Sequence, residues 1–163
     1  MLSIMKILLI DDDKQTTSML SKFFNYEGHS TVVSNDPMEG LTRIKKEKYD
    51  VILLDIKMPV ISGLKIIQIL AAGGNLKNKN VFMFSGAYYL ENQIKDMLRR
   101  DGVNGFLKKP IDLDKLLTTI TCWGFYQTPS RIQQFELFFG KDENWNRKRK
   151  FSLGVFLFYF IKN

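Results

Sequence analysis

Short apolar runs alternate with longer amphipathic stretches along residues 1–122. Most of these runs are apolar on both faces, as a strand must be when helices cover both sides of its sheet. Runs of this kind between helical stretches are typical of repeated βα units around a parallel sheet. The pattern predicts five strands, over Met5–Ile10, Thr31–Val33, Val51–Leu54, Val81–Phe84 and Gly105–Leu107.

The stretches between the strands show helical periodicity, and several begin or end at capping residues. Asp36-Pro37-Met38-Glu39 fits a capping box with proline at the first helical position. Asp112 fits an N-cap, and Gly73-Gly74 fits a helix end. We therefore predict five helices, over Thr17–Phe24, from Asp36, over Leu64–Ala72, over about Leu90–Arg100 and after Asp112. Three of them have a recognisable apolar face. These faces are Met19, Leu20, Phe23 and Phe24 in the first helix, Leu64, Ile67 and Leu70 in the third, and Leu113, Leu116, Leu117 and Ile120 in the fifth.

Strict alternation of strands and helices predicts an α/β fold with a doubly wound, five-stranded parallel sheet. In such a sheet, ligands bind outside the carboxyl ends of the strands, where the direction of winding changes. Four of the five predicted strands end in polar groups that would face this crevice, namely Asp11 with Asp12, then Asp55, Ser85 and Lys109. We expect these side chains to lie close together.

Carboxylates dominate this set. Asp11, Asp12 and Asp13 follow the first apolar run directly, and Asp55 follows the third. Two carboxylates about 4 Å apart repel by roughly 4 kcal/mol at an effective dielectric constant near 20. Their grouping therefore predicts a site for a hard metal ion. Acidic residues after a strand also favour the start of the next helix, and this second role is the one we assign to Asp13.

Composition and charge narrow the classes of protein that remain. The chain has 163 residues, of which 45% are hydrophobic, enough for one globular domain and an appendage. Cys122 is the single cysteine, which excludes an internal disulfide and a cysteine-rich zinc module, and we interpret it as a small buried residue. His29 is the single histidine and is assigned a structural role. The first apolar stretch is broken by Lys6 and does not fit a secretory signal, so we expect a cytoplasmic protein.

Taken together, these segments resemble the receiver domain of two-component response regulators. The resemblance covers most of residues 5–121 and rests on Ile7–Asp13, Asp55–Pro59 with Gly63, Phe84–Gly86 and Phe106–Pro110. It implies a flavodoxin-like fold with strand order 2-1-3-4-5, which we assign to residues 1–122. It also implies a signalling switch rather than a metabolic enzyme, one that catalyses only its own phosphorylation and slow dephosphorylation.

The resemblance assigns the chemistry to particular residues. Asp55 resembles the phosphoacceptor, a carboxylate that takes a phosphoryl group from a phosphohistidine on a sensor histidine kinase or phosphotransfer protein. Asp12 resembles a direct Mg²⁺ ligand, and Asp11 would hold the ion through water. Asp55 and the backbone carbonyl of Lys57 would complete the protein's ligands. Mg²⁺ accepts few carboxylates and retains several waters, which suits this small set.

Three further residues have roles by the same resemblance. Lys109 would pair with a phosphate oxygen, and in the family the peptide bond from this lysine to Pro110 is cis. Ser85 would donate a hydrogen bond to the phosphoryl group. Phe106 resembles the aromatic switch residue that moves inward behind it. Lys108 is the weaker lysine candidate. Phosphorylation would alter the face built by the fourth helix, fifth strand and fifth helix, to which a downstream protein target would bind.

Two other functions remain open at this point. The chain could be an interaction module of the same fold that works without phosphorylation. It could also be a phosphatase of the haloacid-dehalogenase type, which likewise uses an aspartate after the first strand together with Mg²⁺. That family requires Asp-x-Asp followed by x-Thr or x-Val, whereas Gln15 stands at the last position here.

Residues 123–163 form an extension with a different composition. It holds 12 of the 21 aromatic residues of the chain, a basic cluster at Asn146–Lys150 and an apolar run at Phe151–Ile161. The run is too short to span a bilayer, which requires about 20 apolar residues. We expect the extension to pack on the receiver or to form a homodimer, with contact to an anionic membrane, disorder or a nucleic-acid contact as alternatives. No DNA-binding module is recognisable in it, and the net charge of +7 alone says little about nucleic acid.

Overall fold

We describe the computed structural model of the protein over residues 4–86 and 102–126, with side chains up to Thr121. The predicted fourth helix, Leu90–Arg100, and residues 127–163 of the predicted extension lie outside the described residues. The chain divides into two compact units, Met1–Leu113 and Asp114–Asn163. The first unit contains the sheet and the pocket at its carboxyl edge. In the described part of the chain, no helix is both long and apolar enough to cross a bilayer.

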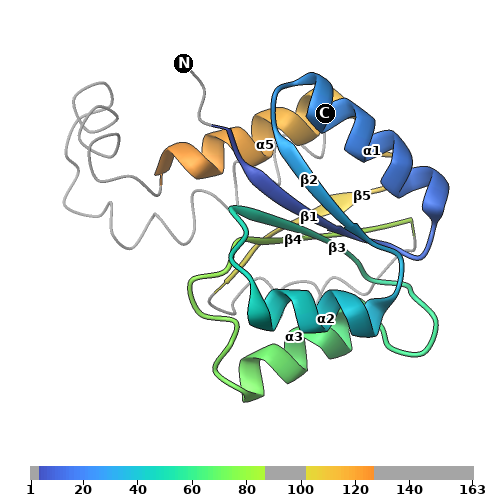
Figure 1. Ribbon diagram of the computed structural model, residues 1–163, viewed down its shortest axis with the longest axis vertical. Helices are drawn as coiled ribbons and strands as arrows, with labels where there is room; N and C mark the ends of the chain where they lie inside the picture. Colours follow the sequence, from blue (N-terminus) through green and yellow to red (C-terminus); the bar gives the residue numbers. More distant parts are fainter. Residues whose placement is uncertain (1–3, 87–101, 127–163) are drawn as a thin grey trace. The chain divides into compact units, whose positions relative to one another are not determined.

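The described strands form one parallel sheet in the order β2-β1-β3-β4-β5 (Figure 1). This order confirms the predicted α/β fold with a doubly wound sheet. The ends of the strands differ from the predicted ends by at most two residues, and the largest difference is at the start of the last strand. The strands are β1 Lys6–Ile10, β2 Ser30–Ser34, β3 Val51–Asp55, β4 Val81–Ser85 and β5 Val103–Lys108.

Local hydrogen bonds set the ends of the helices. The described helices are α1 Lys14–Tyr26, α2 Pro37–Lys46, α3 Gly63–Ala72 and α5 Leu113–Tyr126. The first helix begins three residues earlier than predicted because the extended residue Asp13 accepts a hydrogen bond from the Gln15 N–H and so caps it.

The capping box predicted at the start of α2 is only half formed. The Asp36 side chain accepts hydrogen bonds from the N–H groups of Met38 and Glu39, as predicted. The Glu39 carboxylate instead accepts hydrogen bonds from Ser34 and Arg43. A buried hydroxyl and a guanidinium thus hold the carboxylate that a capping box would turn back to the helix start.

The predicted apolar face of α1 was wrong at one position. Leu20 and Phe24 are buried as expected, but the Met19 side chain is 46% exposed. The buried face is completed instead by Thr17. Residues 17, 20 and 24 follow the helical period, whereas residue 19 lies about 100° around the helix from residue 20. Because Met19 and Leu20 are adjacent and both apolar, the sequence alone did not show which of them belongs to the buried face of α1.

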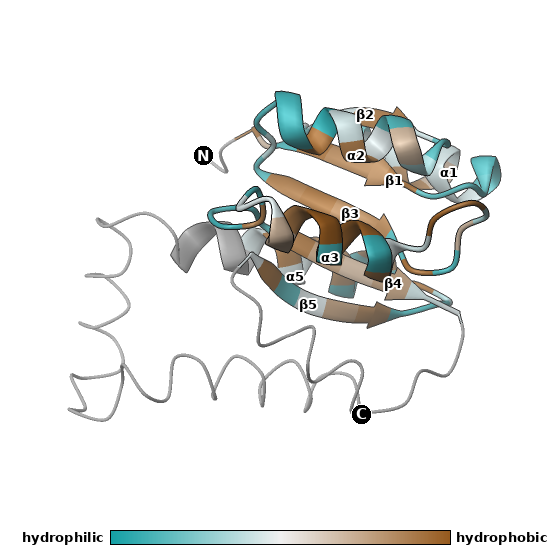
Figure 2. Ribbon diagram, turned by 90° about the horizontal axis from the view of Figure 1, so that it is seen from below, coloured by the Kyte–Doolittle hydropathy of each residue, from teal (hydrophilic) through white to brown (hydrophobic). Residues whose placement is uncertain are grey.

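The helices cover the sheet from both sides. Figure 1 shows α1 on one face and α2 with α3 on the other. Between α2, α3 and the sheet lies an apolar cluster that includes Leu8, Leu41, Ile52, Ile66 and Met83. The central strands β1, β3 and β4 are almost fully buried and strongly apolar (Figure 2), whereas β2 and β5 are partly exposed edge strands. Because helices or the core cover both faces of these central strands, the residues at the ends of the strands are held in defined positions.

The register of the strands brings their carboxyl ends to one edge. Ile10 pairs with Leu54, so Asp11 follows β1 beside the last residue of β3. Ser85 pairs with Lys108 across β4 and β5. Gly63, the first residue of α3, packs so closely on the Asp55 carbonyl that a Cβ there would collide with it. This close approach holds the start of α3 against the end of β3.

Candidate functional site

A pocket of about 370 Å³ lies at the carboxyl edge of the sheet. Its walls come from the ends of β1, β3, β4 and β5, the edge at which a doubly wound sheet binds its ligands. Almost all of the site residues predicted from the sequence are found here. The lining residues are Asp11, Asp12, Asp13, Asp55, Lys57, Ser85, Gly86 and Lys109.

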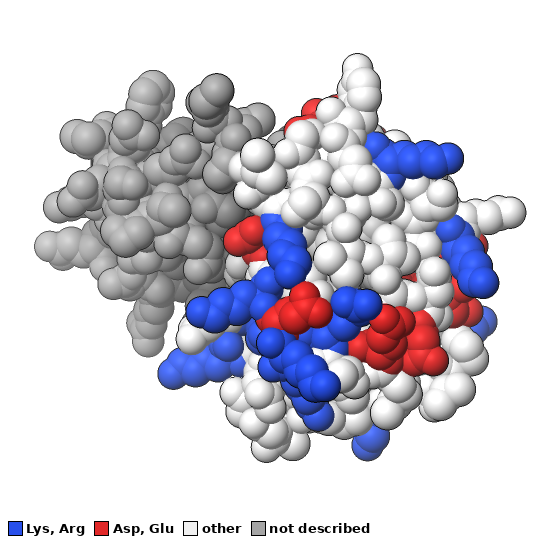
Figure 3. Space-filling view, in the orientation of Figure 1, with Lys and Arg blue, Asp and Glu red and all other residues white. Residues whose placement is uncertain are grey.

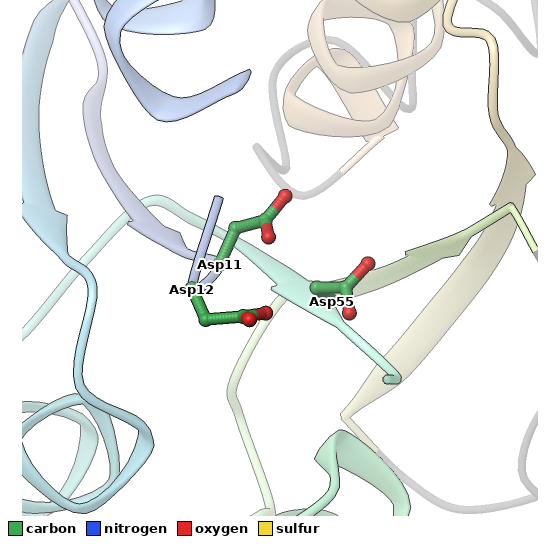
Figure 4. A group of neighbouring side chains, drawn as sticks. All are labelled: Asp11, Asp12 and Asp55. Carbon is green, nitrogen blue, oxygen red and sulfur yellow. The ribbon is translucent and has the colours of Figure 1, made fainter. Parts of the chain in front are cut away.

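Three of the carboxylates face one another. Each of Asp11, Asp12 and Asp55 offers one oxygen, and these oxygens lie within 4.8 Å of one another. Figure 4 shows the Asp11 and Asp12 side chains at the end of β1 beside the Asp55 carboxylate at the end of β3. Asp11 and Asp55 are buried, while Asp12 is exposed to solvent. The cluster therefore has two buried members and one open side.

Lys109 links the two buried carboxylates. Its Nζ lies 2.8 Å from Asp11 Oδ2 and 2.9 Å from Asp55 Oδ1, and 4.7 Å from the centre of the Phe84 ring. The backbone N–H of Lys109 donates to the Ser85 carbonyl, which continues the pairing of β4 with β5 beyond the last strand residue. The peptide bond between Lys109 and Pro110 is cis, as the resemblance implied.

Burial and charge act against each other on these groups. Burial raises the pKa of the Asp55 carboxyl, and the hydrogen bond and charge of Lys109 oppose this shift without cancelling it. Burial alone would lower the pKa of Lys109, but its hydrogen bonds to Asp11 and Asp55 outweigh burial and leave that pKa raised. Lys109 is therefore held as an ammonium ion between two carboxylates.

Asp13 has a different role from its two neighbours. Hydrogen bonds from the Thr16 hydroxyl and the Gln15 N–H lower the pKa of its exposed carboxyl. It caps α1, which confirms the helix-start role predicted for it. Its backbone N–H donates to Asp11 Oδ1 at 3.0 Å and so fixes the neighbouring carboxylate.

The remaining predicted residues divide between the pocket and the core. Ser85 is buried at the end of β4, and Lys57 is exposed at the rim, with its backbone hydrogen-bonded to the Asp55 carboxylate. Phe106 does not line the pocket. It pairs with Met83 in the sheet and packs, partly buried, against the apolar cluster on the α2 and α3 face. Lys108 is exposed and lies outside the pocket lining.

Two features of this edge were missed from the sequence. Asn35, just after β2, donates from Nδ2 to the Asp11 carbonyl at 2.7 Å and to Thr17 Oγ1 at 2.9 Å. Val60 has a φ of 67° and is 94% exposed, a strained backbone for a β-branched residue. The single signal for Asn35 was an amide side chain between a strand and an N-cap, and nothing in the sequence marked Val60.

The geometry suits transfer of an anionic group with the help of a cation. Oxygen ligands at this spacing are those that a hard divalent cation prefers. A buried carboxylate beside an ammonium group can act as a nucleophile. The ammonium of Lys109 and the hydroxyl of Ser85 can stabilise negative charge on an incoming group.

Comparison with known proteins gives a consistent picture. The model of the response regulator receiver domain family matches residues 7–121. The chain is 27% identical over 121 residues to the CAI-1 autoinducer sensor kinase/phosphatase CqsS of Vibrio cholerae, covering 72% of this chain and 17% of that protein. It is 26% identical over 116 residues to the response regulator MprA of Mycobacterium leprae, covering 71% of this chain and 49% of that protein.

The fold has matches among solved structures. The receiver domain of the Francisella response regulator 1452 superposes with a TM-score of 0.68 at 29% identity, over 76% of this chain and 99% of that domain. The full-length relatives are longer, since this chain spans half or less of CqsS and MprA.

Proposed function

The chain belongs to the response regulator receiver domain family, and on that premise we propose that it is a phosphorylation-driven switch in which Asp55 accepts a phosphoryl group. The proposal rests mainly on one observation. Asp55 is 3% exposed and lines an open pocket, in which the Lys109 ammonium lies 2.9 Å from its carboxylate and the Asp11 and Asp12 carboxylates each place an oxygen within 4.8 Å of it. The donor would be a phosphohistidine of a sensor histidine kinase or phosphotransfer protein.

The reaction is an in-line displacement at phosphorus. One Asp55 oxygen attacks, an O–P bond forms, and the P–N bond of the phosphohistidine breaks. The electron pair of that bond returns to the imidazole, which leaves as a neutral ring when its other nitrogen holds a proton. Lys109 favours the reactive carboxylate form of Asp55 against the effect of burial on its pKa. Because such transfers depend on positioning and charge neutralisation, the ammonium and the Ser85 hydroxyl have the main protein roles.

The donor set, three carboxylates with oxygens close together at one pocket, fits Mg²⁺. Asp12 and Asp55 would hold the ion directly, Asp11 through water, and Lys57 through its backbone carbonyl. Three carboxylates against the one ammonium of Lys109 leave an excess that a divalent cation balances. When bound, the ion neutralises charge on the phosphoryl oxygens.

Phosphorylation would be passed on through Ser85 and Phe106. Ser85 would donate a hydrogen bond to the phosphoryl group, and Phe106 would move inward from its partly buried position beside Met83. The altered surface would include β5 and would bind a downstream protein target in the cytoplasm.

The test is phosphorylation by acetyl phosphate with and without Mg²⁺, followed by the intact mass of the protein. The native protein should gain one phosphoryl group with Mg²⁺, and Asp55→Asn should gain none. Asp114→Asn is the matched control because it makes the same change at an exposed position in the first turn of α5. An equal gain of mass in Asp55→Asn would refute the proposal. Steady hydrolysis of phosphate esters that Asp11→Asn abolishes would favour the phosphatase instead.

A further inference from the structure

The acidic turn, which we define as residues 11–17, runs from the end of β1 through the first turn of α1 and presents two of the proposed metal ligands, Asp11 and Asp12. Asp11 is held by Lys109 and by the N–H of Asp13. For the exposed Asp12 carboxylate, no hydrogen bond or ion pair is found among the described residues. The position of Asp12 therefore depends on the backbone of the turn.

Two consecutive residues, Ser34 at the end of β2 and Asn35 just after it, clamp the peptide groups of Asp11. The Asp11 N–H donates to the Ser34 carbonyl at 3.3 Å, and the Asp11 carbonyl accepts from Asn35 Nδ2 at 2.7 Å. The same Nδ2 donates to Thr17 Oγ1 at 2.9 Å. Asp11 is the first residue of the turn and Thr17 is the last. One amide side chain thus bridges both ends of the segment that presents Asp12.

The clamp takes the place of a missing rung of the sheet. In a continued parallel ladder, the Asp11 carbonyl would accept from the backbone N–H of residue 36. The chain leaves the sheet before that point because Asp36 caps α2 and Pro37 begins it. The side chain of Asn35 supplies the donor instead. Ser34 also stabilises the backbone at the point where the chain leaves β2, since its buried hydroxyl lies 2.8 Å from the Asp36 carbonyl oxygen.

The turn needs such a clamp because its carboxylates repel. The oxygens of Asp11, Asp12 and Asp55 lie within 4.8 Å of one another, and one ammonium does not balance them. Asp12 is the exposed member, so an unclamped turn can relieve the repulsion by moving Asp12 outward. The metal would then have to pull the turn back, which would cost binding free energy.

We propose that Asn35 is a positioning residue for the divalent cation: by bridging Asp11 and Thr17 it holds the acidic turn closed and raises metal affinity without touching the metal. Asn35 does not line the pocket. The inference rests on the proposed function, because it assumes that the cluster binds Mg²⁺. Partners that orient metal ligands in this way typically change metal affinity by about 10- to 100-fold when they are removed.

The test is calorimetric titration with Mg²⁺ alone, without a phosphodonor. Asn35→Ala should bind Mg²⁺ about tenfold more weakly than the native protein. The matched control is Asn104→Ala, which removes another bridging amide, one that donates to Asn80 Oδ1 at 3.1 Å near the amino edge of the sheet. Asn104→Ala should bind as the native protein does. Equal affinities in the native protein and Asn35→Ala, or equal losses in both variants, would overturn the inference.

A second pair of variants protects the test against a folding defect. Thr17→Val keeps the shape of the buried side chain but removes the hydroxyl that Asn35 contacts, and Thr17→Ser keeps the hydroxyl. Thr17→Val should weaken Mg²⁺ binding and Thr17→Ser should not. Native affinity in Thr17→Val would overturn the inference even where Asn35→Ala fails to fold.

The titration also separates this inference from the proposed function. A native protein that binds no Mg²⁺ would refute the proposed function. A native protein that binds Mg²⁺ no more tightly than Asn35→Ala does would refute only the role of Asn35. Phosphorylation of Asn35→Ala by acetyl phosphate should return to the native rate at saturating Mg²⁺, because the clamp does not take part in the transfer. A rate that stays low at saturation would contradict a positioning role.

Discussion

The two edges of the sheet both hold clusters of charged side chains, but the clusters are built on opposite principles. At the carboxyl edge, Asp11 and Asp55 are buried, of one sign, and share the single ammonium of Lys109. At the amino edge, Lys6, Arg43 and Glu47 form ion pairs and are each one third to one half exposed. The first cluster has more carboxylates than ammonium groups, whereas each of these three groups pairs with a group of opposite charge.

The amino-edge cluster centres on Glu47. Its carboxylate lies 3.0 Å from Lys6 Nζ and 3.4 Å from Arg43 Nη1, and it accepts a hydrogen bond of 2.9 Å from the Tyr49 hydroxyl. Lys79 donates to the Ile44 carbonyl at the end of α2. Figure 3 shows basic and acidic side chains interleaved over the region of α2. Lys6, Arg43 and Glu47 already have partners of opposite charge, and Lys79 has a backbone carbonyl, as expected of a cluster that only stabilises the fold.

This difference gives a criterion for telling a binding site from a structural cluster. Buried groups of like charge destabilise the fold until a ligand of opposite charge binds. Such a cluster therefore indicates a binding site for that ligand. Exposed and balanced pairs gain little from any ligand. The carboxyl edge therefore should respond strongly to changes in charge, and the amino edge weakly.

The largest expected effect is that of Lys109→Met. The substitution leaves Asp11 and Asp55 buried without their ammonium, so the free energy of unfolding in EDTA at neutral pH should fall by about 3 kcal/mol. Phosphorylation by acetyl phosphate should slow by about 100-fold or more, because the charge on the phosphoryl group loses its partner. Urea unfolding and intact mass measure the two effects.

The matched control for this variant lies at the other edge. Lys6→Met removes an ammonium from the exposed Glu47 pair and should change the free energy of unfolding by less than about 1 kcal/mol, with no change in phosphorylation. Equal losses in Lys6→Met and Lys109→Met would contradict the contrast between the edges.

The next effect has the opposite sign. Since burial raises the pKa of the Asp55 carboxyl above its ordinary value of 3.8, Asp55 stabilises the fold below pH 3.8 and loses that contribution as the pH rises through the raised pKa. Without metal, Asp55→Asn should therefore be more stable than the native protein at neutral pH, by about 1 kcal/mol. The difference should shrink as the pH falls. Urea unfolding at several pH values, with Asp114→Asn as control, measures it, and a difference that grows toward acid would refute the raised pKa.

The contrast also explains how much of the molecule the sequence could predict. The apolar runs of β1, β3 and β4 are local signals of burial, and the strand order makes their polar ends converge. The predicted convergence of Asp55, Ser85 and Lys109 at one pocket is therefore confirmed. Capping is equally local, which is why Asp36 was recognised as a helix cap and Asp13 as a residue at the start of a helix.

What the sequence could not predict depends on contacts between distant segments. Asn35 acts on Asp11 only because β2 lies beside β1, so its role became visible with the strand order and the side-chain geometry. Met19 was assigned to the wrong face because it is adjacent to Leu20 and equally apolar, and only one of the two can point into the core. The left-handed backbone at Val60 has no residue signal, since glycine or asparagine would be expected there.

The smallest expected effect is that of Glu47→Gln, and it tests the weak side of the comparison. Hydrogen bonds from Lys6 and Tyr49 lower the pKa of the Glu47 carboxyl from 4.5, so its contribution is present above pH 4.5 and is lost as the pH falls through the lowered pKa. This pH dependence is opposite to that of Asp55. At neutral pH and low salt the variant should melt about 2 °C below the native protein, and high salt should remove the difference because exposed pairs are screened. Phosphorylation should not change, and a changed rate would mean that the amino edge is coupled to the pocket after all.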